Sequence, residues 1–312
     1  MRACVSLLLG LALTLAVSVT AFAHIGEMQF IPQVPNPGAM TIDGNDDDWG
    51  WMDAAYAFTS DKMVKGGAEP DFTREDFDVV YFMGWSAPPD RDFGCFYMFA
   101  RVTDDVLDIN EGNPDWWWAD DSFLLAFDPD HSGGNIFGTE IEHTQNGHRY
   151  AVRIASSSAG QENYEYGRTG LYFGPSIYLG LPELRWGNEP PYCDFASTLL
   201  PAGSEHGATD VTYTYELKMN LWDFYGLSRE ESTPHVFAAD QVIHAQCQFG
   251  DSDVADVRNE QGYDSTLELG PPVATHINAD EHYDHYLVAG EVAVEPSTWG
   301  RIKSHMDRQL SR

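Results

Sequence analysis

The feature that most constrains the fold of this chain is a series of short β-type segments, rich in apolar residues whose side chains would alternate between two faces. Clusters of Gly, Pro, Asn and Asp separate these segments. In residues 95–103, Phe96 and Met98 would face one side of a strand while Tyr97 and Phe99 face the other. The expected strands are residues 78–85, 95–103, 122–127, 149–154, 212–219 and 236–249. Strands of this length with turn residues between them predict an all-β fold, an antiparallel β-sandwich of the immunoglobulin or jelly-roll kind.

The N-terminus predicts an exported protein. Arg2 is followed by an apolar, uncharged run over residues 5–19, and residues 21–23 (AFA) have the small-residue pattern that signal peptidase recognises. We expect residues 1–23 to be removed and the mature protein to be secreted, with the extracellular medium, the cell surface and the periplasm all open. No other stretch has the length that a membrane span needs.

The rest of the chain is expected to form one main domain with two different ends. Residues 24–40 contain three prolines and are predicted to form an extended arm. Residues 41–292 contain the expected strands. Residues 293–312 are predicted to contain a short C-terminal helix, because Ser297 can cap it and apolar residues follow at helical spacing. Self-association through the two ends is a further hypothesis.

The formal net charge of −32 excludes some partners. Nucleic acid and anionic lipid would be repelled, whereas divalent cations and neutral ligands such as a poly- or oligosaccharide are compatible with an acidic protein. A simpler explanation, that the acidity keeps the protein soluble, also stays open.

Cysteine usage is sparse. Cys4 leaves with the signal peptide, so that Cys95, Cys193 and Cys247 remain. These residues allow one disulfide and a free thiol, or three thiols buried as small hydrophobic side chains.

Several segments carry a resemblance when they are taken in order. They are residues 41–51 (TIDGNDDDWGW), 100–107 (ARVTDDVL), 118–128 (WADDSFLLAFD) and 213–217 (YTYEL, with Trp222 shortly after), and more weakly residues 248–251 (QFGD). Together they resemble the family 9 carbohydrate-binding modules and their relatives in the DOMON-like superfamily. The resemblance implies a β-sandwich that binds sugars on aromatic side chains and holds structural calcium.

The same resemblance implies where a sugar would bind. Trp118 occupies the position of the family's sugar-stacking tryptophan, and Trp116 and Trp117 widen the aromatic surface. Asp120 and Asp121 follow directly and could accept hydrogen bonds from sugar hydroxyls. The alternative is that the three tryptophans close the end of the sandwich.

The family's second aromatic wall is a tryptophan that this sequence lacks in the comparable region, residues 276–287. Tyr283 or Tyr286 could take its place, and Trp186 is another candidate.

Two acidic segments are candidate calcium sites, since Ca²⁺ prefers oxygen ligands. The first is a loop with oxygen-bearing side chains before and after glycines, and its candidate ligands are Asp128, Asp130, Ser132 and Asn135. The second is the cluster of Asp43, Asp46 and Asp47. A hairpin turn is the alternative for the first, and a solvated turn for the second.

A third cluster combines nitrogen and oxygen donors and could hold Zn²⁺ or Cu²⁺. Its members are His276, Asp280, His282, Asp284 and His285. An exposed His24 at the mature N-terminus could also chelate copper, but no partner histidine can be assigned, so copper is not expected there.

The function predicted from these features is non-catalytic carbohydrate binding with calcium as a structural ion. We assign no catalytic residue, because 49 acidic residues make any carboxylate pair uninformative and no hydrolase, metalloprotease or nucleotide-binding motif is present. Two alternatives stay open: a haem-binding relative, although no Met–His spacing favours haem, and a structural or assembly protein of the cell surface.

Overall fold

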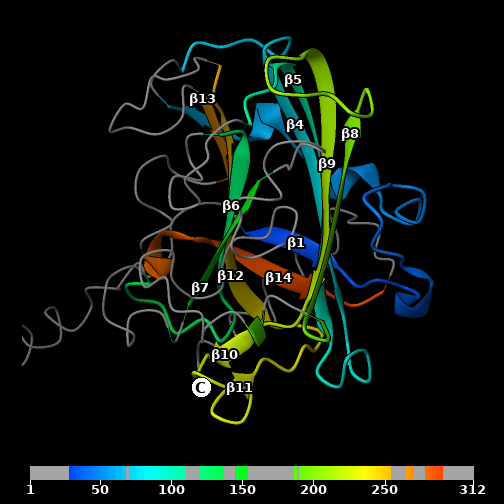
Figure 1. The fold of residues 1–312 in the computed structure, drawn as a ribbon. Coiled ribbons are helices and arrows are strands. Elements are labelled where there is room, and N and C mark those ends of the chain that lie inside the picture. The colour runs from blue at the N-terminus through cyan, green and yellow to red at the C-terminus, as the bar shows by residue number, and fades with distance from the viewer. Residues whose placement is uncertain are drawn as a thin grey trace, which may run out of the picture.

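Two β-sheets lie face to face and form a sandwich, as Figure 1 shows. The computed structural model describes residues 28–67, 70–109, 120–136, 145, 147–153, 186–187, 190–253, 265–269 and 278–290. The predicted β-sandwich is therefore confirmed. The predicted C-terminal helix and the signal peptide lie outside the described residues.

The first sheet has five strands, all antiparallel, in the order β2-β4-β5-β9-β8. Its strands are β2 (Phe58–Thr59), β4 (Phe77–Ser86), β5 (Cys95–Val106), β9 (Thr209–Met219) and β8 (Cys193–Leu200). The long strands β4, β5 and β9 lie next to one another and pair over most of their length.

The second sheet has seven strands and is organised around β12 (Val242–Asp251). One side of β12 pairs with β6 (Ser122–Asp128), which pairs with β7 (His148–Arg153). The other side pairs with β14 (Tyr283–Val288) near its start and with β13 (Ser265–Glu268) at its end. Strand β3 (Val64–Gly66) adds to β13, and β1 (Gln29–Pro32) adds to β14 in parallel orientation.

The structure adds strands that the sequence did not predict, among them β3, β8, β13 and β14, and it changes the assignment of two segments. Residues 29–32 belong to the predicted arm but form β1, whose parallel pairing with β14 makes it part of the sandwich. The expected strand 236–249 begins only at Val242, because Asp240 has a left-handed backbone (φ 68°). A small separate ribbon joins β10 (Trp222–Phe224) and β11 (Thr233–Pro234). Short 3₁₀ helices among the described residues include η1 (Pro37–Ala39), η2 (Ala54–Tyr56), η3 (Ser60–Lys62) and η6 (Ala279–Glu281).

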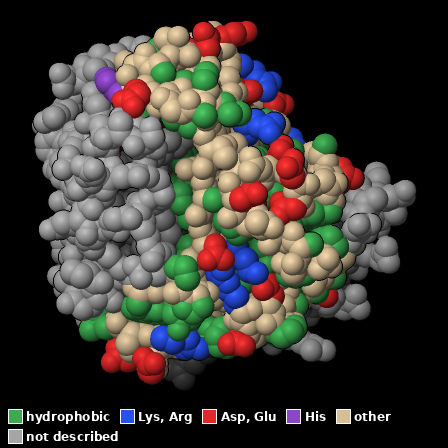
Figure 2. Space-filling view, turned by 45° about the vertical axis from the view of Figure 1, so that its right-hand side comes forward, with side chains coloured by type: hydrophobic (Ala, Val, Ile, Leu, Met, Phe, Trp, Pro, Cys, Tyr) green, Lys and Arg blue, Asp and Glu red, His purple; other side chains and the backbone are tan. Residues whose placement is uncertain are grey.

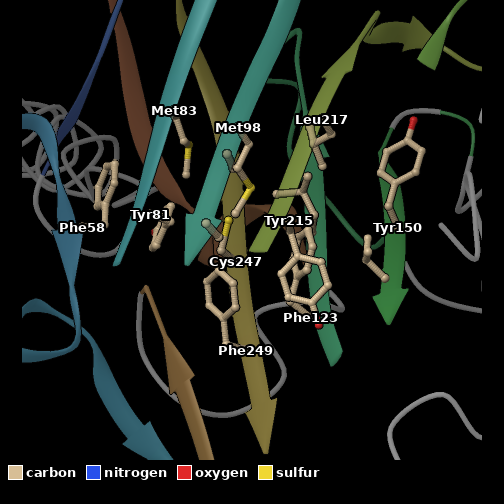
Figure 3. Packing of buried hydrophobic residues seen from close by; sticks show 14 of the residues in the cluster. Phe58, Tyr81, Met83, Met98, Phe123, Tyr150, Tyr215, Leu217, Cys247 and Phe249 are labelled. Carbon is tan, nitrogen blue, oxygen red and sulfur yellow. The ribbon is translucent and has the colours of Figure 1, made fainter. Parts of the chain in front are cut away.

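The core lies between the two sheets and is rich in aromatic and sulfur-containing side chains (Figure 3). Each long strand sends every second residue inward, as the alternation predicts. Phe123 of β6 lies with its ring centroid 4.7 Å from Tyr215 of β9, and Phe96 lies 4.8 Å from Phe127, so both pairs join the two layers. Burial of this kind of apolar surface supplies the main stabilising contribution to the fold.

The three described cysteines, Cys95, Cys193 and Cys247, are buried free thiols. Of the two alternatives that the sequence left open, the structure therefore selects three buried thiols. Burial raises the pKa of Cys247 and holds it in the neutral form.

The surface mixes charges of both signs on the face seen in Figure 2, where Lys and Arg side chains lie among Asp and Glu side chains. In the part of the chain that the structure covers, no helix has the length and apolar character to cross a bilayer.

Candidate functional site

Glu216 holds the opening segment of the domain against the outer face of the five-stranded sheet. Its neighbours Tyr215 and Leu217 point into the core, so strand alternation turns Glu216 to the opposite face, where it is fully buried. One carboxylate oxygen accepts the indole N–H of Trp49 at 2.8 Å. The other accepts the backbone N–H groups of Asp43 and Gly44 at 2.9 and 2.8 Å. We call this set of contacts the Glu216 latch.

Gly44 is required in the Glu216 latch for two reasons. Its φ of +83° lies in the left-handed region, and a Cβ atom there would approach the backbone of Ser197 to 2.8 Å. The first and fourth segments of the sequence resemblance, residues 41–51 and 213–217, thus meet in one structural contact. In these two segments, the residues that form the Glu216 latch stabilise the fold.

A second group of carboxylates lies at one end of the core. Asp104, Asp121 and Asp251 are each less than 2% exposed, and one oxygen of each lies within 4.8 Å of the others. We call them the Asp cluster. Asp76, Asp105 and Asp253 extend it, because they form overlapping triplets with Asp104 or Asp251 at the same spacing.

Strand alternation explains why these carboxylates converge. Phe123 is an inward-facing residue of β6, and Asp121 comes two positions before it. In β5, Asp104 comes two positions after the inward-facing Val102, and in β12, Asp251 follows Phe249 in the same way. The three aspartates therefore continue the apolar series of three strands, drawn from both sheets, at the end of the core.

The electrostatic environment of the Asp cluster opposes ionisation. Burial, and then the neighbouring carboxylates led by Asp104, raise the pKa of Asp251 to about 10. Burial and the charges of Asp104 and Asp251 raise the pKa of Asp121 well above its usual range. Burial also raises the pKa of Asp104 to about 6, although a hydrogen bond with Asp121 acts in the other direction. These groups repel one another unless protons or a cation neutralise them.

The residues of the Asp cluster fit a calcium ion. Within the described residues, neither carboxylate oxygen of the buried Asp251 has a hydrogen-bond partner. An unpaired buried carboxylate is costly unless it binds a cation. Ca²⁺ takes six to eight oxygen ligands, and the donors here are all carboxylate oxygens.

Asp121 also joins the Asp cluster to the segment that contains the predicted sugar-stacking tryptophans. Its backbone N–H donates to the carbonyl oxygen of Asp108 at 2.9 Å, and its carboxylate accepts the backbone N–H of Asp108 at 2.7 Å. The other carboxylate oxygen accepts the backbone N–H of Ser252 at 3.1 Å. These bonds hold the two ends of residues 109–120 together.

The predicted sugar-site residues differ in where they lie. Trp116, Trp117 and Trp118 fall outside the described residues. Asp120 and Asp121 were expected beside an exposed aromatic surface, but both are buried, at 1% and 0% exposure. The carboxylate oxygens of Asp121 accept hydrogen bonds from backbone N–H groups inside the protein and do not face solvent, where a sugar would bind.

The candidates for a second aromatic wall are dispersed. Tyr286 is only 5% exposed, and its hydroxyl donates to Asp240, which leaves little ring surface for a ligand. Tyr283 is partly buried against the core. Trp186 is half-buried, stacks on Tyr225 at 4.5 Å and donates its indole N–H to the carbonyl of Gly226. The described structure therefore does not bring these three side chains together.

The loop predicted to bind calcium satisfies its leading carboxylate internally. Asp128 accepts the backbone N–H groups of Ser132 and Gly133, the latter at 2.7 Å, and also the Nδ1–H of His244 at 2.9 Å. Asp130 accepts the Ser132 N–H, and Asn135 forms a bridge with Asn278. These contacts are those of a turn that its own side chains hold, and the sequence alternatives of a hairpin turn and a calcium loop are not decided by them. A calcium ion at this loop stays a prediction.

The second predicted calcium cluster lies in the segment that the Glu216 latch holds. Asp43 accepts the backbone and side-chain N–H groups of Asn45, and Asp46 pairs with Arg101. Asp47 is exposed. These contacts are typical of the solvated turn that was the alternative, and calcium there also stays a prediction.

Sequence reasoning missed the Asp cluster as a cation site, although Asp104, Asp121 and Asp251 all lie in segments that carry the resemblance. The alternation of inward- and outward-facing residues along each strand was the signal that could have predicted this cluster. An acidic residue at the next inward position after an apolar series predicts a carboxylate facing the core end, and three such strands predict a cluster.

No protein-family profile matches the chain, and no curated protein matches it. Among solved structures, a carbohydrate binding module family 9 from Caldicellulosiruptor kristjanssonii in complex with cellotriose is similar in fold. Its sequence identity is 13% and its TM-score 0.49, over 86% of this chain and 98% of that chain. The same kind of module in complex with glucose gives 12% identity and a TM-score of 0.46, over 86% and 100%. The assignment of the β-sandwich to this chain rests on the strand pairing described above.

Proposed function

We propose that this chain is a secreted, non-catalytic carbohydrate-binding protein that stacks a sugar on the tryptophans of residues 116–118 and is stabilised by calcium. One observation carries the proposal. Asp121 closes the base of residues 109–120 through its bonds with Asp108, and the same side chain belongs to the Asp cluster. A cation in the Asp cluster would thereby fix the base of the segment that presents the tryptophans.

The chemistry of the tryptophans supports a sugar as the ligand. A pyranose ring has an apolar C–H face that packs on an indole, while its hydroxyls need hydrogen-bond partners at the edge of the ring. A run of three tryptophans supplies the flat apolar surface, with Trp118 as the principal contact. A base fixed by calcium would lower the entropy that the segment loses when it binds a ligand.

Calcium in the Asp cluster also agrees with a location outside the cytoplasm. Extracellular modules fill calcium sites with dissociation constants of about 10⁻⁴ to 10⁻³ M, which cytosolic calcium would leave empty. The N-terminal signal sequence predicts the same location.

A direct test is isothermal titration with a panel of oligosaccharides that includes glucose and cellotriose, with calcium present or chelated. Trp118→Ala is expected to weaken binding by roughly tenfold or more, because truncation of a central aromatic contact typically costs over 1 kcal/mol. Trp118→Phe keeps a flat ring and is the matched control, with a smaller expected loss.

Chelation is expected to weaken binding without unfolding the protein, as judged by its circular dichroism. The absence of binding to every sugar in the presence of calcium would overturn the proposal. So would binding that the alanine variants of Trp116, Trp117 and Trp118 all leave unchanged.

A further inference from the structure

The outer face of the seven-stranded sheet carries a second cluster of side chains that could bind a metal ion. This cluster offers imidazole nitrogens as well as a carboxylate oxygen. In the register of three neighbouring strands, His244 of β12 lies opposite Asp128 of β6 on one side and opposite Asp284 of β14 on the other. The neighbours Ile243 and Ala245 point into the core, so His244 points away from it. Strand pairing alone thus places these three side chains in one row.

The turn after β6 adds a second histidine to this row. At the end of β6, His131 has a left-handed backbone with φ of +59°, and Gly133 and Gly134 also have positive φ. The turn brings the ring of His131 over that of His244, with the ring centroids 3.9 Å apart. The ligating atoms of His131, His244 and Asp284 all lie within 4.8 Å of one another.

The distances between these atoms suit a tetrahedral metal ion. Asp284 Oδ1 lies 3.0 Å from His131 Nε2 and 3.1 Å from His244 Nε2. Ligands about 2.0–2.1 Å from a zinc ion at tetrahedral angles would be roughly 3.3 Å apart, so an ion needs only a small outward shift of the side chains.

Asp128 holds His244 in the orientation that ligation requires. The Nδ1–H of His244 donates to Asp128 Oδ2 at 2.9 Å, which leaves Nε2 directed at Asp284. Asp128 is itself fixed by the backbone N–H groups of Ser132 and Gly133. Metal-ligating histidines typically donate their other ring N–H to a carboxylate in this way, which fixes the tautomer.

The sequence placed Asp284 in a different metal cluster, and strand alternation divides that cluster. Asp284 faces outward, whereas the next residue, His285, faces the core, with its ring centroid 6.3 Å from that of Phe58. Asp280 accepts the backbone N–H of Gly134, and His282 is buried with its ring centroid 6.3 Å from that of His244. His276 lies outside the described residues. The two histidines that join Asp284, His131 and His244, come from distant segments of the chain.

We propose that His131, His244 and Asp284 bind one zinc-class divalent cation, with Asp128 as the positioning residue behind His244. Two imidazole nitrogens and one carboxylate oxygen favour Zn²⁺ over Ca²⁺, so this site and the Asp cluster select different ions. The side chain of His131 is 28% exposed, which gives the ion access from solvent and leaves a fourth position for water. The ion would clamp the turn at residues 129–134 to β12 and β14.

The test is a titration of the tag-free protein with Zn²⁺ in the presence of excess Ca²⁺, which occupies the Asp cluster. Co²⁺ serves as a second probe, because tetrahedral cobalt has intense visible absorption bands that octahedral cobalt lacks. Zinc is used instead of copper, so that any chelation of copper by an N-terminal His24 does not enter the stoichiometry. We expect one equivalent of Zn²⁺ to bind and to displace Co²⁺ with loss of the visible bands.

His131→Ala and Asp284→Asn are expected to weaken Zn²⁺ binding at least tenfold. His131 lies in a partly exposed turn, so its loss should leave the fold intact. His206→Ala is the matched control, because His206 is also a partly exposed histidine paired with an aspartate, Asp108, at 3.1 Å. Zinc affinity should be unchanged in that variant.

The rival explanation is that His131, His244 and Asp284 form only hydrogen bonds and ion pairs. The proposal fails if the protein binds no Zn²⁺ in the presence of Ca²⁺. It also fails if the Co²⁺ complex lacks tetrahedral bands, or if both His131→Ala and Asp284→Asn keep the affinity of the natural protein.

Discussion

Glu216 and Asp251 are both buried carboxylates on long strands, and their surroundings are opposite. Glu216 accepts three N–H donors, from Trp49, Asp43 and Gly44. Asp251 has no hydrogen-bond partner within the described residues and lies among other carboxylates. The comparison shows that burial alone does not indicate what a carboxylate does. A satisfied carboxylate is explained by the fold, whereas the unsatisfied one among like charges is where we propose that calcium binds.

The largest effect on stability is expected from Glu216→Gln, which tests whether Glu216 stabilises the fold through its hydrogen bonds. A glutamine amide has one acceptor oxygen, so one side of the Glu216 latch would present N–H groups to N–H groups. The free energy of unfolding should fall by on the order of 3 kcal/mol, because hydrogen bonds to a charged group and unsatisfied buried donors are both involved. Urea denaturation would measure it. The loss should be equal with and without calcium, and a calcium-dependent loss would contradict this separation of the two regions.

Calcium removal tests whether a cation neutralises Asp251 and the rest of the Asp cluster. At a Ca²⁺ concentration about a hundredfold above the dissociation constant, binding should stabilise the protein by about 2.7 kcal/mol. For a domain of this size that corresponds to a rise in Tm of roughly 5–10 °C. Differential scanning calorimetry with calcium and with chelator would measure the rise, and magnesium is the control ion. An unchanged Tm would show that protons, and not a cation, neutralise the Asp cluster.

Asp251→Asn is expected to have a smaller effect, of opposite sign in the two states. Without calcium the folded protein must keep a proton on Asp251, whose pKa is raised to about 10, whereas the unfolded chain releases that proton. Asparagine is neutral in both states and avoids this cost, so the calcium-free protein should gain about 1 kcal/mol. The calcium-dependent rise in Tm should be largely lost. Asp130→Asn, in the turn after β6, is a matched control that should keep it. A calcium response of full size in the Asp251→Asn protein would remove Asp251 from the site.

The smallest expected effect is a loss of stability in acid that comes from a buried histidine and not from either group of carboxylates. His148 is fully buried and donates Nε2–H to the carbonyl of Trp222. Burial lowers its pKa to about 4, although Asp128 and Asp223 act in the other direction and His235 adds to the lowering. Because the unfolded state takes up the proton first, stability should fall as the pH drops from about 6.5 towards 4.

At pH 5.5 the loss from His148 should be about 1 kcal/mol relative to pH 7, with calcium in excess. Urea midpoints at the two pH values would measure it. The His148→Gln variant should lose less stability over the same interval than the natural protein. An identical pH dependence in the two proteins would assign the acid sensitivity to other groups.

The strands were the part of the molecule that the sequence could predict, because alternation is a local property. The run from Cys95 onward was assigned correctly in position and in the separation of its two faces. Short strands such as β3 and β13 were missed, since three or four residues give too little periodicity. Strand β1 was missed because Pro32 and the prolines after it favour an irregular segment.

The clusters of side chains could be predicted only in part. Asp104, Asp121 and Asp251 lie far apart in the sequence, and their meeting depends on how two sheets pack. His244 and Asp284 meet through strand register, which the sequence does not display. The acidic loops at Asp43 and Asp128 attracted a calcium prediction because adjacent carboxylates are visible in a sequence. In the structure those side chains bind nearby N–H groups or an arginine.

The parallel pairing of β1 with β14 has a consequence for the order in which the protein assembles. The strand β1 needs a partner that a ribosome makes about 250 residues later, so β1 stays without this partner until β14 has been synthesised. A chain that stops before β14 would leave both β1 and the starting half of β12 as open sheet edges, a template for pairing between chains. Addition of β14 therefore covers both of these edges in one step.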